Sequence, residues 1–110
     1  MALDNSLYDS LQNTYFEINT YLESVQLGRE HSAVMIQHEE LGELLETFDI
    51  EALEEQTKDI QGLHDQLDII KEISDDVVKA IKKEDDSQTK AENVFNGLKT
   101  IFEKIDQIVL

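Results

Sequence analysis

The stretch DIQGLHDQLDIIKEISDDVVKAIKK, residues Asp59–Lys83, carries the strongest structural pattern in the chain. Its apolar residues recur every three, four or seven positions, as in the a and d positions of heptads: Ile60, Leu63, Leu67, Ile70, Val77 and Ile81. Only Ser74 interrupts this pattern. The spacing predicts an amphipathic helix with a coiled-coil-like seam. We therefore expect the rest of the chain to form helices that cover this seam.

The composition favours one domain built from helices. The chain has 110 residues, four Gly, and no Pro, Cys or Trp. A chain of this length forms one domain, so we expect residues 1–110 to build a single helical bundle. Absence of Pro is typical of long helices, because Pro interrupts the backbone hydrogen bonds of a helix. Absence of Cys excludes disulfides, Cys-bound zinc, iron–sulfur clusters and thiol catalysis.

Turn and cap signals predict four helices, at approximately residues 6–27, 32–46, 50–83 and 88–109. Predicted N-terminal caps are Ser6 (with Asp4 or Asn5 as alternatives), Ser32, Asp49, and Asp86 or Ser87. Gly28 is expected in the left-handed conformation that ends many helices. Gly62 is expected to mark a close helix crossing or a short kink. One continuous helix over residues 6–47 is the alternative, but it would be about 60 Å long.

These elements predict an all-α fold, an antiparallel bundle of three long or four shorter helices with coiled-coil-like seams. The last helix has its own seam, and its apolar end through Leu110 should pack: Val94, Leu98, Ile101, Ile105 and Ile108. All three tyrosines and Phe16 lie in the first helix. We expect these aromatic residues to be mostly core, with a groove for a partner helix as the alternative.

The charge distribution is uneven. The formal net charge is −16, and residues 1–57 hold 13 acids and one base, Arg29, whereas residues 58–110 hold 12 acids and eight Lys. Such a charge repels nucleic acid and anionic lipid, and it favours a basic protein partner. The candidate contact residues are glutamates of the first half: Glu39, Glu40, Glu43, Glu46, Glu51 and Glu54. The simpler interpretation, which the composition alone favours, is that the acids only keep the protein dispersed in water.

Membrane and export signals are missing from the sequence. No stretch approaches the roughly 18 apolar residues that a membrane span needs. The N-terminal residues lack the basic and apolar layout of a signal peptide. We therefore expect a cytoplasmic protein with neither membrane nor nucleic-acid partners, and we leave signal-less export and a homodimer open.

The histidines give no convincing metal or catalytic site. A helical metal pair needs a second ligand three or four residues away, and neither His31 nor His38 has one. His64 has Asp68 at that spacing, but chance supplies such pairs in an acid-rich chain. No G-x-S-x-G motif and no Gly-rich phosphate loop occurs. We therefore predict no catalytic residue, no bound metal and no cofactor.

Two short motifs resemble those of known families. His38-Glu39-Glu40-Leu41-Gly42 is similar to the H-x-x-K-G signature of histidine phosphotransfer domains, which are helical bundles of comparable length. Leu41 stands where that family has Lys, and the adjacent glutamates would repel the acidic pocket of a receiver domain. Phe102-x-x-x-Asp106 resembles the aromatic-x-x-x-acid signal of type VII secretion substrates, although the W-x-G turn of that family is absent.

The function predicted from these observations is that of a non-catalytic acidic helical protein-interaction module. In concrete terms it is an adaptor, chaperone or inhibitor that binds a basic or helical protein. The alternatives are a nucleic-acid mimic that inhibits a DNA-binding protein, a structural oligomer subunit, and a histidine phosphotransfer-like domain.

Overall fold

The computed structural model describes residues 6–109, which form helices joined by short connections. In chain order these are α1 (Leu7–Ser24), the 3-10 turn η1 (Arg29–His31), α2 (Ser32–Thr47), α3 (Ile50–Thr57), α4 (Gln61–Lys83) and α5 (Ser87–Val109). This range contains no strand, so the all-α prediction is confirmed. None of its helices is both long and apolar enough to cross a membrane. The alternative caps Asp4 and Asn5 and the terminal Leu110 lie outside the described residues.

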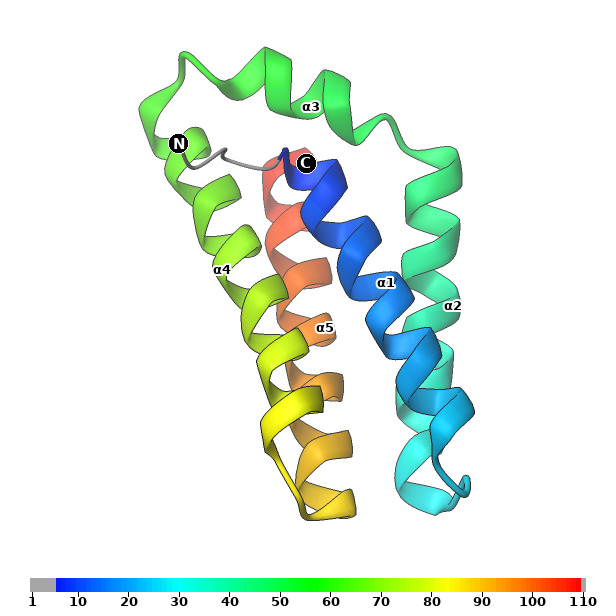
Figure 1. Cartoon of the computed structure of the whole chain (residues 1–110). Coiled ribbons are helices and arrows are strands. Elements are labelled where there is room, and N and C mark those ends of the chain that lie inside the picture. The colour runs from blue at the N-terminus through cyan, green and yellow to red at the C-terminus, as the bar shows by residue number, and fades with distance from the viewer. Residues whose placement is uncertain (1–5, 110) are drawn as a thin grey trace.

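The four long helices form a bundle, and the short α3 lies across one end of it (Figure 1). Helices joined by short connections are antiparallel, namely α1 with α2 and α4 with α5. Because α3 carries the chain across the end of the bundle, α4 packs beside α1 and runs in the same direction. For the same reason α5 packs beside α2. The bundle is thus antiparallel within each helical hairpin and parallel between the two hairpins.

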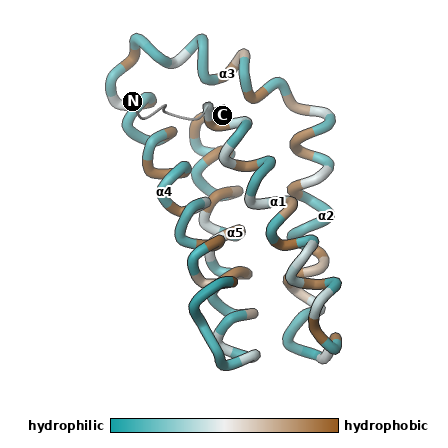
Figure 2. The backbone as a smooth tube through the Cα atoms, viewed as in Figure 1, coloured by the Kyte–Doolittle hydropathy of each residue, from teal (hydrophilic) through white to brown (hydrophobic). Residues whose placement is uncertain are grey.

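The core lies between the long helices. Apolar and polar residues alternate along each of these helices (Figure 2). The two predicted seams supply much of the core: Leu67, Ile70 and Val77 from α4, and Val94, Leu98, Ile101 and Ile105 from α5. The opposite wall comes from α1 and α2, with Leu7, Leu11, Ile18, Tyr21, Val34 and Leu41. Burial of these apolar side chains is the main force that holds the helices together.

Ser74, the interruption in the α4 seam, is fully buried where α4 meets α1. Its hydroxyl donates to the carbonyl oxygen of Ser10 at 3.1 Å and lies against the hydroxyl of Thr14. Thr14 Oγ1 donates in turn to the Ser74 carbonyl oxygen, also at 3.1 Å. Buried polar groups stabilise a fold only when they have such partners. This polar cluster therefore favours one register of α1 against α4.

The predicted helix over residues 50–83 is wrong in one respect, because the structure divides it into α3 and α4. The chain leaves helical geometry at Ile60, whose backbone is extended and whose side chain is exposed. The break has a tertiary cause, since α3 must lie across the end of the bundle and α4 along it. Gly62 has open space around its Cα, so it marks no close crossing. In place of the predicted short kink, the helix breaks just before this glycine, between Thr57 and Gln61.

The predicted break near Gly28 is confirmed, but its details differ. Helix α1 already ends at Ser24, and Gly28 has an extended backbone with φ −126° in place of the left-handed conformation. The Gly28 amide donates to His31 Nδ1 at 2.9 Å, which closes the turn without a left-handed residue. His31, and not Ser32, occupies the cap position of α2. The caps Ser6, Asp49 and Asp86 are confirmed by hydrogen bonds to the first turns of α1, α3 and α5.

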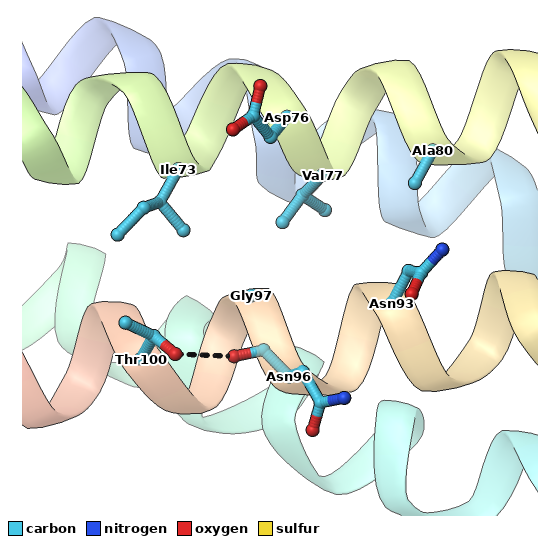
Figure 3. A pocket seen from close by; sticks show the side chains of 8 residues that line it. All are labelled: Ile73, Asp76, Val77, Ala80, Asn93, Asn96, Gly97 and Thr100. Carbon is cyan, nitrogen blue, oxygen red and sulfur yellow. Dashed lines mark hydrogen bonds between the residues drawn. The ribbon is translucent and has the colours of Figure 1, made fainter.

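Val77 of α4 faces Gly97 of α5 in a shallow groove between the two helices (Figure 3). A Cβ atom at position 97 would overlap the Cγ2 methyl of Val77. Ile73 Cγ2 and Val77 Cβ would lie at ordinary contact distances of 3.9 and 3.8 Å from it. Glycine at position 97 therefore permits the observed spacing of the two helices.

Candidate functional site

Four of the predicted contact residues lie on the exposed side of α2. Their carboxylates belong to Glu39, Glu40, Glu43 and Glu46, all of which are exposed. None of them takes part in an ion pair within residues 6–109. The sequence has no Lys or Arg between Arg29 and Lys58, so no cation is available on α2 or α3. Like charges one turn apart, such as Glu39 with Glu43, cost a few tenths of a kcal/mol each.

Two large apolar residues share this exposed side. Ile36 is 58% exposed and Met35 is 41% exposed, one turn before Glu39 and Glu40. We call the six residues Met35, Ile36, Glu39, Glu40, Glu43 and Glu46 the α2 acidic face. This face offers a protein partner of opposite charge both an apolar contact area and unpaired carboxylates.

The remaining two predicted residues lie on α3 and differ from each other. Glu51 is exposed at a polar cleft of about 400 Å³ that Lys58 and His64 also line. Glu54 is half-buried, and its two carboxylate oxygens accept the Leu7 amide at 3.1 and 3.2 Å. It also pairs with Lys71 Nζ at 3.1 Å. Glu54 therefore links α3 to both α1 and α4. At the N-terminus of α1 its negative charge is favourable, because it interacts with the positive end of the helix dipole.

A groove between α1 and α2 borders the α2 acidic face. We call it the aromatic groove. Its volume is about 160 Å³, and its lining residues are Tyr8, Gln12, Tyr15, Phe16, Gly42, Leu45 and Glu46. Phe16 is 57% exposed, whereas Tyr8 and Tyr15 are half-buried. The rings of Tyr15 and Phe16 meet edge to face at 5.9 Å. Of the aromatic residues predicted as core in the first helix, only Tyr21 is fully buried.

Tyr15 is held in the aromatic groove by two residues of α2. Its ring stacks on the ring of His38, with centroids 4.2 Å apart and planes inclined by 14°. Its edge rests on Gly42, where an added Cβ would lie 3.0 Å from Tyr15 Cε1 and 3.2 Å from the hydroxyl oxygen. Glycine at this position leaves room for the tyrosine ring. The Tyr15 side of the groove is therefore held in place by packing.

His38 is a structural residue of the α1–α2 contact. Its side chain is 9% exposed, and Nε2 lies 3.2 Å from the Tyr15 carbonyl oxygen, to which the ring donates. Burial lowers the pKa of His38, although the Tyr15 carbonyl and the Glu39 charge oppose this change. A phosphoryl acceptor must present a ring nitrogen to its partner. The position of His38 therefore does not favour the phosphotransfer activity that the short motif implies.

The other two histidines differ in their surroundings. His31 is buried, and its Nδ1 accepts the Gly28 amide, which leaves no lone pair of that nitrogen for a metal. His64 is exposed on α4, where its ring nitrogen and carboxylate oxygens of Asp65 and Asp68 lie within 4.8 Å of one another. Lys71 Nζ lies 3.9 Å from Asp68 and competes for that carboxylate. The predicted absence of a metal site stays a prediction.

The sequence pattern indicates the glutamates of α2 but not their relation to α1. It predicts Tyr8, Tyr15 and Phe16 mainly as core residues, and it does not place Gly42 or Glu46 beside them. The sequence signal for the groove is the width of the apolar face of α1, which is broader than one neighbouring helix can cover. In comparisons with protein-family models, curated proteins and solved structures, the chain has no match.

Proposed function

We propose that this protein is a non-catalytic interaction module whose α2 acidic face binds a basic amphipathic helix of another protein. The observation that carries the proposal is the combination of unpaired glutamates and exposed Ile36 on one side of α2. Carboxylates steer a cationic partner toward this face, and the apolar residues supply contact area once water is excluded. A helix laid on another helix recognises such surfaces through residues spaced three and four positions apart.

The charge of the rest of the chain supports the same partner. A net charge of −16 attracts a basic protein from a distance and slows encounters with acidic ones. The lysines of the second half are absent from α2, so they do not shield this face from within the helix. The same field disfavours nucleic acid and anionic membranes as partners.

Binding to a synthetic amphipathic helix with an apolar stripe and a lysine face tests the proposal. We expect fluorescence anisotropy to detect binding at low ionic strength and to show it weakening steeply with salt. Replacing Glu39, Glu40, Glu43 and Glu46 together by Gln should abolish most of the affinity. The proposal is wrong if the wild-type protein does not bind the peptide at low salt.

A control variant separates the local effect from net charge. Glu72, Asp75, Glu103 and Asp106 are exposed on α4 and α5, and replacing them by Gln or Asn changes the net charge by the same amount. We expect this variant to bind almost as well as the wild type. Equal losses in the two variants would show that total charge, and not the α2 acidic face, determines binding.

A further inference from the structure

We infer that the aromatic groove is an arginine-receiving site, which takes one guanidinium group from the basic helix bound to the α2 acidic face. This inference rests on the proposed function and names the side chain that the partner must supply. The groove combines aromatic rings from α1 with the carboxylate of Glu46 from α2. That pairing of a π-surface and an anion is what an arginine side chain satisfies best.

The size of the aromatic groove sets the scale of its occupant. A volume of about 160 Å³ equals that of roughly five water molecules, and a helix with side chains is about 10 Å across. The groove therefore accepts one long side chain and not a whole helix. Glu39 and Glu43 are exposed on α2, one helical turn from the lining residues Gly42 and Glu46, where they can pair with further cations of the same helix.

Arginine fits this site better than lysine for geometric reasons. Its planar guanidinium can stack on the exposed ring of Phe16 while it donates two parallel hydrogen bonds to Glu46. A lysine ammonium is a compact, strongly hydrated charge and gains less from contact with a ring. The groove is also preformed, because His38 and Gly42 fix the position of Tyr15. Little ordering of the Tyr15 ring is then needed on binding.

A second copy of the chain is the competing occupant, because Arg29 is exposed and is the only arginine in the sequence. Self-association would bring two chains of net charge −16 together, which is electrostatically unfavourable. A basic partner meets no such repulsion. We therefore assign the groove to an arginine of a different, basic protein.

Two peptides that differ only in carrying Arg or Lys on the basic face test the inference by isothermal titration calorimetry. We expect the wild-type protein to bind the arginine peptide roughly fivefold more tightly than the lysine peptide. Phe16→Leu and Glu46→Gln should each bring this ratio close to one, because they remove the ring or the anion. Ile36 lies outside the groove, so Ile36→Ala should weaken the binding of both peptides equally.

The outcomes distinguish the two proposals. Equal affinity of the wild type for both peptides, or a preference for arginine that survives in Phe16→Leu and Glu46→Gln, overturns the arginine site and leaves the proposed function intact. Failure of both peptides to bind overturns the proposed function as well. Light scattering that shows a dimer in the wild type and a monomer in Arg29→Ala would assign the groove to a second copy instead.

Discussion

The contact between Gly97 and Val77 permits a sharp test of the helix packing. Replacing Gly97 by Ala adds one methyl group, which by helix propensity alone should stabilise α5 by up to about 1 kcal/mol. The added carbon would overlap Val77 Cγ2. Val77 is buried, and a valine in a helix has essentially one favoured rotamer, so it cannot turn aside at low cost. Overpacking of this kind costs about 1–3 kcal/mol, and the net expectation is a loss of about 1–2 kcal/mol.

The double variant shows whether the clash is the cause. Val77→Ala alone removes two buried methyl groups and should cost about 2 kcal/mol. With Val77 shortened, the Cβ atoms at positions 77 and 97 are at an ordinary distance of 3.8 Å. Gly97→Ala should then be neutral or stabilising in the Val77→Ala background. The coupling energy between the two changes is expected to be about 2 kcal/mol.

Urea unfolding followed by circular dichroism measures these free energies. Gly62→Ala is the matched control, because Gly62 is also helical but has open space around its Cα. We expect Gly62→Ala to stabilise the protein by up to about 1 kcal/mol. Additivity of Gly97→Ala and Val77→Ala within about 0.5 kcal/mol would refute the packing argument.

Three further predictions concern polar groups between helices. Ser74→Ala should lower the free energy of unfolding by about 1–2 kcal/mol, measured in urea, because it removes the buried hydrogen bond to Ser10. Glu54→Gln should lower the free energy of unfolding by about 1 kcal/mol, because it removes the negative charge at the start of α1 and opposite Lys71. Unchanged stability would show that this bridge contributes nothing. Burial lowers the pKa of His38 in the folded state. As the pH falls below about 6.5, the unfolded chain therefore takes up a proton at His38 before the folded chain does, and the free energy of unfolding decreases. Thermal unfolding of His38→Gln at pH values on both sides of about 6.5 should show a smaller decrease than the wild type.

The helices themselves follow from local sequence, whereas the break between α3 and α4 does not. Asp49 and Asp86 are predictable caps because each needs only the amides that follow it in the chain. Residues 58–60 contain neither Gly nor Pro, and nothing local requires a helix to end there. The break arises because α3 packs across the bundle end, which only the tertiary structure determines.

Long-range partners explain the other differences between sequence and structure. Ser74 appears in the sequence only as a gap in a seam, because its partners lie some 60 residues earlier in α1. Glu54 looks like any other glutamate of the first half until the start of α1 is placed beside it. The aromatic groove requires residues of α1 and α2 together. Periodicity describes one helix at a time, so it predicts faces but not the neighbours of each face.

The distribution of ion pairs indicates which surface folding leaves available. Lys71 pairs with Glu54 and Lys82 with Glu17, so these cations bridge different helices. The glutamates of α2 have no such partner in the described chain and repel one another along the helix. A bound basic helix would neutralise this repulsion at the same time as it covers Ile36 and Phe16. Under the proposed function, the residues that weaken the free helix are therefore those that strengthen the complex.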